Sequence, residues 1–405
     1  MQSDSVNLKF LRAITIALLV FDAGMFGFVS AQSLSVTGYF ENQLTPQQIG
    51  GKLRWQEYNK VRFDFSSEIN DNLTFHGNYN IRVFHGATQF NALDFIPESV
   101  VAPFLESAGI PMSALLPELD FSFEDESFLD NAYVSFYGDH FNFRVGKQQL
   151  PWGTGYSWNP TDQFHDKNLL DPAYEKTGVN ALKLEIPFGG QAQFTAVLGI
   201  GDSLTSSTKG LKMKHHLKGY DLSVSFIEKQ QSLLDLASFS EKLIKRRMYG
   251  FDFSGELLGL GVWGEGAYNS LANADNFGQY LVGADYTFNS GLYLVSEYYR
   301  NGLGKSRKED YSLTDWLRLL NENGENLGRN YVFVGQSYPI AELWTWANFA
   351  IYNFDDHSGL AFPWITWNFD DNAEILFVGY IPFGPESSEY GEFGAGGFAR
   401  IRIYF

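Results

Sequence analysis

From Leu34 onward, hydrophobic and polar side chains alternate with a period of two, which is typical of β-strands. Between residues 73 and 83 every second residue is apolar or glycine, and the residues between them are polar or charged. The same alternation returns at 192–200, at 280–286 and at 399–405. Each of these segments is therefore expected to form a strand with one apolar and one polar face.

This alternation predicts about eighteen strands, and an even number is typical of closed barrels in bacterial outer membranes. Pro363 lies inside one predicted strand, where proline removes a ladder hydrogen bond, and the segment 210–218 is weakly apolar. A count of sixteen therefore stays open. The predicted strands start near residues 33, 52, 72, 128, 141, 178, 191, 210, 220, 246, 260, 279, 292, 329, 342, 360, 373 and 395.

The connectors between these strands alternate between short and long. The short ones, such as Asn70–Asn72 and Gly189–Gly190, have the composition of hairpin turns. The long ones all fall at the opposite end if the first strand starts at the short-turn end, an asymmetry that transmembrane barrels show. They span residues 87–126, 152–176, 228–245 and 301–328.

Three long connectors also carry helical patterns, at Pro97–Ala108, Ser232–Lys245 and Tyr311–Asn321. The last begins with Ser312 and Asp315, which have the spacing of a capping box. The expected fold class is therefore all-β, a transmembrane antiparallel up-and-down β-barrel with long external loops that carry short helices.

The first 31 residues have the pattern of an export signal. Lys9 and Arg12 precede an apolar stretch at 13–21, and small residues at Val29–Ala31 suit a signal peptidase. Asp22 interrupts the apolar stretch, which argues against an N-terminal anchor helix. The expected organisation is a signal peptide over 1–31 and one barrel domain over 32–405.

Composition narrows the class of protein further. No uninterrupted apolar run reaches the roughly 18 residues that a membrane helix needs. The chain contains no cysteine, which excludes disulfides, thiolate metal sites and a lipoprotein anchor. The net charge of -18 argues against binding to nucleic acid phosphates and to anionic lipid headgroups.

With its export signal, its alternating strands and its final residues Arg402–Phe405, the sequence resembles the porin class of bacterial outer-membrane barrels. A terminal Phe405 preceded by Ile401 and Ile403 at alternate positions resembles the membrane-insertion signal of such barrels. This resemblance implies outer-membrane lipid and the barrel assembly machinery as partners. The segment 145–162 is similar to a block found in uncharacterised porin-like proteins, which assigns no activity.

The connector that follows residue 149 is the most unusual loop in the sequence, because aromatic residues alternate there with glycines and turn formers. A loop so rich in aromatic residues is expected to fold into the lumen and narrow the pore. Packing against the inner wall for stability alone stays open, as does outward display for binding a partner or a sugar. The constriction candidates are Trp152, Tyr156, Trp158, Asp162 and Phe164.

If the apolar faces point outward, several charged residues point into the lumen, where charge sets ion preference. The loop 91–130 holds nine acidic residues and no basic residue, which predicts an acidic mouth. The alternative is that the lumen charges only pair with one another. The candidates are Arg82, Arg144, Lys183, Glu185, Lys212, Lys214, Arg400 and Arg402.

Enzyme motifs occur only in unsuitable contexts. The lipase-like start Gly201–Leu204 and the glycine pattern Gly259–Gly264 lie at predicted hairpins, where neither motif has its helix. His215 and His216 point to opposite faces of a strand and cannot chelate one metal. The segment Asp355–Ser358 could orient a water molecule but has the composition of a solvated turn. We expect no catalytic residue, no metal site and no cofactor.

The sequence thus favours a channel for passive or weakly selective diffusion of small hydrophilic solutes. The alternative is a barrel plugged by its loops that serves adhesion, assembly or surface enzymology. The solute and the association of several barrels into a homo-oligomer stay open.

Overall fold

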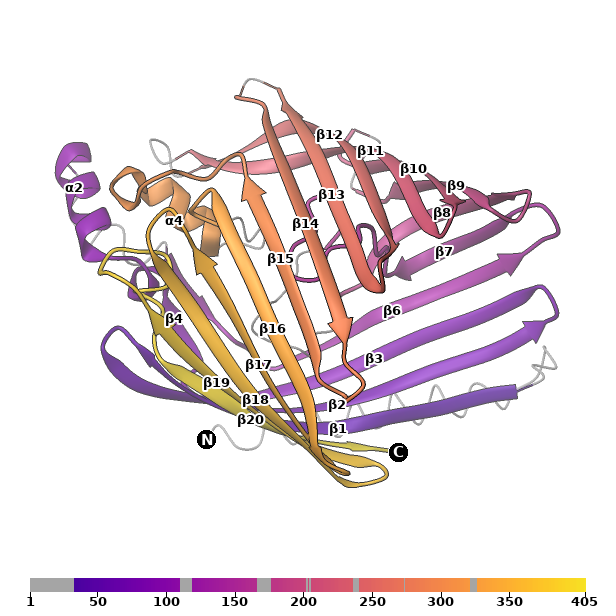
Figure 1. Cartoon of the computed structure of the whole chain (residues 1–405), viewed down its shortest axis with the longest axis horizontal. Helices are drawn as coiled ribbons and strands as arrows, with labels where there is room; N and C mark the ends of the chain where they lie inside the picture. Colours follow the sequence, from indigo (N-terminus) through magenta and orange to yellow (C-terminus); the bar gives the residue numbers. More distant parts are fainter. Residues whose placement is uncertain are drawn as a thin grey trace.

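The chain forms a closed antiparallel barrel of eighteen strands (Figure 1). The expected export signal lies outside the residues that the computed structural model describes. Those residues are 33–109, 119–165, 176–201, 203, 205–235, 240–272, 274–320 and 326–405.

The barrel strands are β1 (Ser33–Ile49), β2 (Lys52–Asn70), β3 (Leu73–Gly86), β6 (Glu126–Tyr137), β7 (Asn142–Gln148), β8 (Val179–Phe188), β9 (Ala192–Gly199), β10 (Thr208–Leu217), β11 (Tyr220–Asp235), β12 (Ser240–Leu257), β13 (Leu260–Leu271), β14 (Phe277–Thr287), β15 (Tyr293–Asn301), β16 (Asn330–Ala341), β17 (Trp344–Asn353), β18 (Ser358–Asp370), β19 (Ala373–Phe383) and β20 (Gly396–Tyr404). A separate two-stranded sheet joins β4 (Gln89–Asn91) and β5 (Asp120–Ser122).

The sheet closes where β1 pairs with β20, with Tyr39 opposite Tyr404 and Leu44 opposite Ala399. All the remaining pairings join barrel strands that follow one another along the chain, and all of them are antiparallel. The predicted up-and-down barrel is therefore confirmed, and the strand count is eighteen rather than sixteen.

The two faces of the strands differ as the alternation predicts. In β9, Thr195 and Val197 are buried on the inner face, while Leu198 faces outward. Aromatic side chains form two levels on the outer face, as in the interfacial girdles of membrane barrels. One level contains Phe226, Tyr249, Tyr268 and Tyr280, and the other, near the short turns, contains Tyr286, Phe288, Trp344 and Trp367.

Tight turns close the hairpins at the rim opposite the long loops, and several of them contain residues with positive φ. At Lys218–Gly219 the φ angles are 51° and 86°, and at Leu258–Gly259 they are 55° and 82°. Two successive residues with positive φ are the signature of the two-residue turn that matches the twist of a hairpin. These turns therefore fix the register of the hairpins β10–β11 and β12–β13.

The helix expected at Ser232–Lys245, and with it the long connector at 228–245, is wrong. Residues 232–235 and 240–245 belong instead to β11 and β12, which pair up to Asp235 and Ser240. On β12 the side chains of Ile244, Arg246 and Met248 are buried at alternate positions. Cross-strand pairing imposes a period of two there and overrides the local helical pattern.

Pro363 lies inside β18, as the sequence predicts, and pairs with Asn348 on β17. On the other side, pairing with β19 runs from Gly359 to Ala361 and resumes at Trp364. The strand thus continues past the proline, with its ladder to β19 interrupted at the residue that cannot donate.

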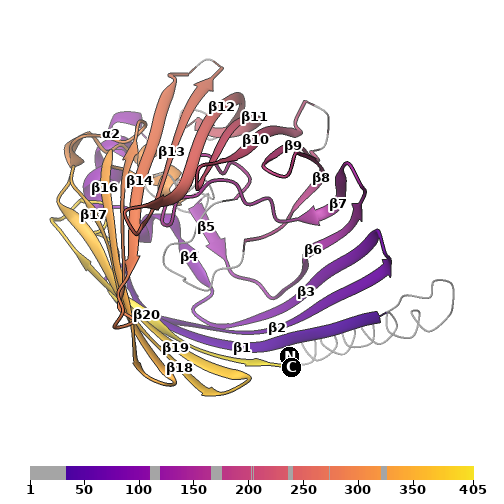
Figure 2. The same cartoon turned by 45° about the vertical axis from the view of Figure 1, so that its right-hand side comes forward.

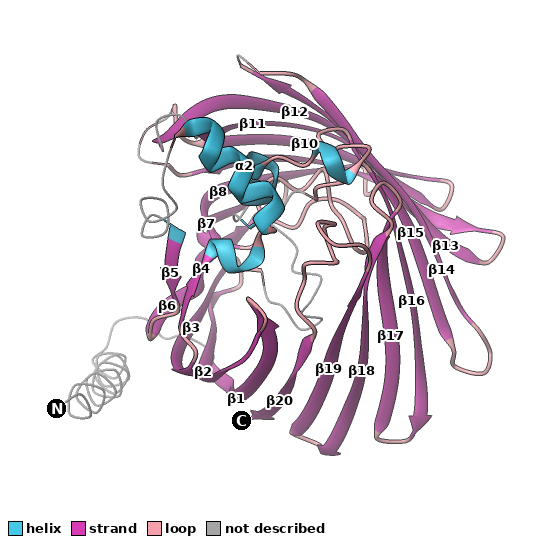
Figure 3. Cartoon of the chain, turned by 90° about the vertical axis from the view of Figure 1, so that its left-hand side faces the viewer, coloured by secondary structure: helices cyan, strands magenta, loops and turns pink. Residues whose placement is uncertain are grey.

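Two helices lie at the long-loop end of the barrel, as the sequence predicts: α2 (Glu98–Ala108) and α4 (Leu313–Leu320) (Figure 3). Single 3-10 turns, η1 (Ala92–Phe95) and η3 (Lys308–Asp310), precede them. Ser312 and Asp315 cap α4 reciprocally, with the Ser312 N–H 3.0 Å from the Asp315 carboxylate. No helix in the described part of the chain is long and apolar enough to cross a membrane. The two helices pack through an apolar cluster of Ile96, Val101, Leu105, Tyr311, Leu313, Trp316 and Leu327.

A second, larger apolar cluster lies on the inner face of β13–β20. Phe333, Phe349 and Phe362 are buried at inward positions of adjacent strands, with ring centroids about 6 Å apart. The lumen is therefore not polar all round, because one wall is aromatic and is covered by loops. This wall positions the loop described next.

Candidate functional site

The segment 149–165, which follows β7, turns into the barrel and packs on its inner wall (Figure 2). Leu150, Trp152 and Trp158 are buried there. Gly153 has a φ of 85°, and a Cβ at this position would lie 2.6 Å from the Glu265 carboxylate. The glycines of the segment therefore allow its backbone to approach the wall closely.

Glu265, on the inner face of β13, holds this loop on both sides of its centre. Its carboxylate accepts hydrogen bonds from the backbone N–H groups of Thr154, Gly155 and Thr161, the last two at 2.6 and 3.1 Å. The Thr161 hydroxyl donates a further bond at 2.7 Å. A buried carboxylate thus satisfies loop N–H groups that the fold removes from water.

Glu297, on the inner face of β15, holds the centre of the loop in the same way. It accepts the backbone N–H groups of Tyr156, Ser157 and Trp158 at 2.7, 3.0 and 3.0 Å. The indole N–H of Trp263 donates to the same carboxylate at 2.6 Å. Since Glu297 is fully buried, these bonds define one position for the loop.

The aromatic candidates pack against the wall. Trp152 contacts Phe164 edge-on, with ring centroids 5.1 Å apart. Trp158 stacks on Tyr299 at 5.0 Å and donates its indole N–H to Asn326. Tyr156 covers the wall aromatics and remains 42% exposed, so it is the candidate aromatic that most faces the open lumen.

Asp162 is buried at the end of the loop. Its carboxylate accepts the Lys176 ammonium at 2.8 Å and the backbone N–H groups of Phe164 and His165. Burial alone would raise its pKa, but His165 and Lys176 hold the pKa below its ordinary value. Asp162 therefore ties the end of this loop, as an anion, to Lys176 ahead of β8.

The predicted lumen charges all lie on the inner face, and the structure gives them partners along the wall. Lys183 pairs with Glu185 at 3.0 Å. Arg144 lies over the Tyr133 ring and donates to Ser135. The other wall pairs are Arg82–Glu126, Lys212–Asp252 and Lys214–Asp221, at 3.1, 3.0 and 2.7 Å.

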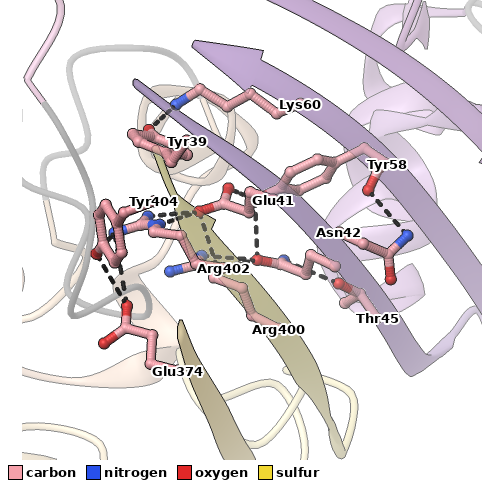
Figure 4. Close-up of polar contacts among 11 residues, drawn as sticks. Tyr39, Glu41, Asn42, Thr45, Tyr58, Lys60, Glu374, Arg400, Arg402 and Tyr404 are labelled. Atoms are coloured by element: carbon pink, nitrogen blue, oxygen red, sulfur yellow. Dashed lines mark hydrogen bonds and ion pairs between the residues drawn. The ribbon is translucent and has the colours of Figure 1, made fainter. Parts of the chain in front are cut away.

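Arg400 and Arg402 lie at the seam between β20 and β1, where Figure 4 shows them around Glu41. Arg402 donates through two guanidinium nitrogens to Glu41, and Arg400 lies 3.8 Å from the same carboxylate. Tyr58 donates to Glu41 at 2.8 Å. A cavity of about 450 Å³ adjoins this network on the side of the short-turn rim. It is lined by Thr37, Tyr39, Arg62, Asp64, Arg402 and Tyr404, among others.

On the opposite face of β20, the structure places Ile401, Ile403 and Phe405 outward. Phe405 pairs through its backbone with Gly38 in both directions at 2.9 Å, and its ring contacts Phe63 edge-on. This placement fits a lipid-facing role, and their function as an insertion signal stays a prediction.

A buried acidic cluster connects the long loops near the mouth. Glu389, in the loop before β20, accepts hydrogen bonds from the side-chain amides of Asn353 and Asn326 at 2.9 and 3.0 Å. The Tyr331 hydroxyl donates to the same carboxylate. Its backbone N–H donates to Asp356 at 2.8 Å. Burial raises the pKa of Glu389 to about 7. Since Asn326 also accepts from Trp158, this cluster is continuous with the inward loop.

The segment Asp355–Ser358 does not assemble as an acid–histidine pair. Asp356 is buried and accepts from Ser358 and from the Tyr311 hydroxyl. His357 contacts Tyr352 instead, at 3.3 Å. Asp356 therefore supports the loop cluster rather than orienting the histidine.

Sequence reasoning missed the acidic residues that hold these networks, Glu41, Glu265, Glu297 and Glu389. One signal was present for three of them. Glu41, Glu265 and Glu297 occupy inward positions of strands, where a carboxylate needs a donor. The sequence did not indicate which donors would reach them.

No protein-family model matches the chain, and no curated protein matches it in sequence. Among solved structures, the chain is similar to OccAB1 of Acinetobacter baumannii, with a TM-score of 0.58, 8% identity and coverage of 94% of this chain and 98% of that one. It is also similar to OccK5 of Pseudomonas aeruginosa, with a TM-score of 0.57, 7% identity and coverage of 93% and 99%. A triple mutant of Rhodopseudomonas blastica porin has a TM-score of 0.46, 12% identity and coverage of 92% and 100%. Identities this low concern the fold, so the chain has the fold of a porin-type outer-membrane β-barrel, and that fold supports the expected location in the bacterial outer membrane.

Proposed function

We propose that the protein is an outer-membrane channel for small hydrophilic solutes, and that the loop 149–165 narrows its lumen. The observation that carries this proposal is the attachment of the loop to Glu265 and Glu297 through six backbone N–H groups. A loop fixed inside a barrel reduces the open cross-section wherever it lies. Insertion by the barrel assembly machinery and contact with outer-membrane lipid belong to the same proposal, and catalysis does not.

Selectivity in this proposal is weak. The cations of the β1–β3 and β20 wall have carboxylate neighbours, as for Arg402 and Glu41 or Arg82 and Glu126. Paired charges leave a smaller field in the lumen than the cations alone would. The opposite side offers Tyr156 as an exposed aromatic surface. The expected solutes are therefore small and hydrophilic, with modest discrimination by charge.

Purified protein in planar bilayers tests the proposal. We expect stable single-channel steps from the wild type, and larger steps with a larger solute cutoff after deletion of residues 156–165. The control is to shorten the β11–β12 hairpin at Leu243, on another part of the long-loop rim, where the Leu243 side chain is exposed. Unchanged conductance and cutoff in a correctly inserted deletion variant would show that the loop does not limit flow.

A second candidate is a barrel plugged at its mouth that serves adhesion or assembly. The packing of α2 against α4 across an apolar cluster supports it, because these helices lie at the long-loop end. In this case the wild type would show no conductance steps. Conductance that appears only after removal of residues 98–108 would favour the plug over the channel.

A further inference from the structure

A cluster of basic side chains lies on the outer face of β10–β12, toward the long-loop end. Lys209, Lys245 and Arg247 surround Glu228, with nitrogen to oxygen distances of 3.6, 3.5 and 2.9 Å. The side chains of the three cations are about half exposed, and that of Glu228 is less so. One carboxylate thus faces three cations, which leaves a local positive excess in a chain of net charge -18.

The strand register places this cluster outward. Glu228 lies opposite Lys209 on β10 and opposite Arg247 on β12. The neighbouring residues Ile227 and Met248 are buried on the inner face. Because side chains alternate along a strand, the charged residues point away from the lumen. They cannot take part in solute passage through it.

The outer aromatic level lies directly beneath the cluster. Phe226 lies two positions from Glu228 along β11, and Tyr249 lies two positions from Arg247 along β12, both toward the short turns. Their ring centroids are 5.3 Å apart. Leu211, opposite Phe226, faces outward beside them. Aromatic girdles mark the boundary between the hydrocarbon band and the headgroups. The basic cluster is thus at the level of the headgroups.

The distance along β11 agrees with this level. Tyr220 lies beside the short turn Lys218–Gly219, and Glu228 is eight residues farther along the strand. With about 3.3 Å per residue and a tilt of about 40°, the rise from Tyr220 to Glu228 is roughly 20 Å. The apolar band of such barrels is about 25 Å tall. Measured from Tyr220, Glu228 lies about 5 Å short of the far edge of the band, and Lys245, opposite Gln230 two residues farther along β11, lies at that edge.

We propose that Lys209, Lys245 and Arg247 bind the phosphorylated headgroup of a lipid in the leaflet on the long-loop side. Ammonium and guanidinium groups bind phosphate oxygens through charge-assisted hydrogen bonds. Free phosphate shares this chemistry. A lipid fits better, because the apolar surface of Leu211, Phe226 and Tyr249 continues below the cations and can contact acyl chains.

The test is native mass spectrometry of the full barrel in detergent, titrated with diphosphoryl lipid A, with diacylglycerol as the phosphate-free probe. Replacing Lys209, Lys245 and Arg247 together by Gln should weaken lipid A binding by on the order of 10- to 100-fold. Glu228→Gln should strengthen it by roughly fivefold, because it removes the competing anion. Diacylglycerol binding should not respond to either change.

The matched control removes three positive charges elsewhere, by Lys52→Gln, Lys218→Gln and Arg307→Gln together. Equal loss of lipid A binding in the control and the cluster variant would overturn the proposal, because attraction would then be general. Weaker binding of lipid A to the Glu228→Gln variant would also overturn the proposal. This single variant keeps the test informative if the triple variant does not fold. Displacement of lipid A by an equal concentration of inorganic phosphate would identify a free-anion site instead of a lipid site.

Discussion

Replacing Glu297 by Gln tests whether the inward loop depends on its buried carboxylate. One oxygen of Glu297 accepts Ser157 and Trp158, and the other accepts Tyr156 and the indole of Trp263. A glutamine keeps one acceptor oxygen and turns an NH₂ group toward the second pair of donors. Two donors therefore lose their acceptor, at about 1.5–3 kcal/mol each for a bond to a charged group, or about 3–6 kcal/mol together.

This loss should release the loop without opening the barrel, because Glu297 bonds to the loop and to one indole rather than to the strand ladder. We expect larger or noisier single-channel currents, and faster chymotrypsin cleavage after Tyr156 and Trp158. The matched control is Glu185→Gln on the inner face of β8, where the carboxylate pairs with Lys183 and Gln193 and does not contact the loop.

Two results would refute this reasoning. If Glu297→Gln leaves both conductance and cleavage at wild-type values, the carboxylate does not hold the loop. If Glu185→Gln changes them equally, the effect arises from lumen charge and not from the loop.

Three further predictions concern the mouth, the seam and the two faces of the strands. Burial raises the pKa of Glu389 from 4.5 to about 7, so the loop cluster is most stable below about pH 4.5 and loses stability as the pH rises through 7. The hydrogen-exchange protection factors of residues 384–395, which are corrected for the intrinsic pH dependence of exchange, should fall over this range in the wild type and not in Glu389→Gln. Removing Phe405 takes away its paired backbone bonds to Gly38, and we expect loss of the heat-modifiable form on gels; full yield of that form would contradict this. Val224→Arg puts a charge on the lipid face midway along β11 and should cost roughly 2–4 kcal/mol in urea unfolding, whereas Gln193→Arg, beside Glu185 on the inner face, should cost little; equal costs would show that the faces are assigned wrongly.

The strands could be predicted closely from the sequence because a half-buried strand repeats its signal every second residue. The starts expected at 33, 52, 260 and 373 are the first residues of β1, β2, β13 and β19. The hairpin β11–β12 was misjudged beyond residue 231, where leucines and polar residues also suit a helix. There, only the partner strand determines the period.

The candidate site could be predicted in part. Aromatic and glycine residues indicated which loop folds inward, but its attachment joins Thr154 to Glu265 and Tyr156 to Glu297, which are 111 and 141 positions apart. Periodicity reports which face a residue occupies and not what lies across the lumen. For the same reason the partners of Arg402 and Lys212 could not be named in advance.

The seam between β1 and β20 has a consequence for how the protein assembles. Glu41 and Arg402 are 361 positions apart, and bringing such distant segments together costs roughly 5 kcal/mol of chain entropy, whereas each hairpin forms between neighbours. Closure is therefore expected to be the slow, late step of folding. Until it occurs, both strands expose unpaired backbone edges, which invite aggregation. A protein built this way has to be shielded from other chains until its first and last strands meet.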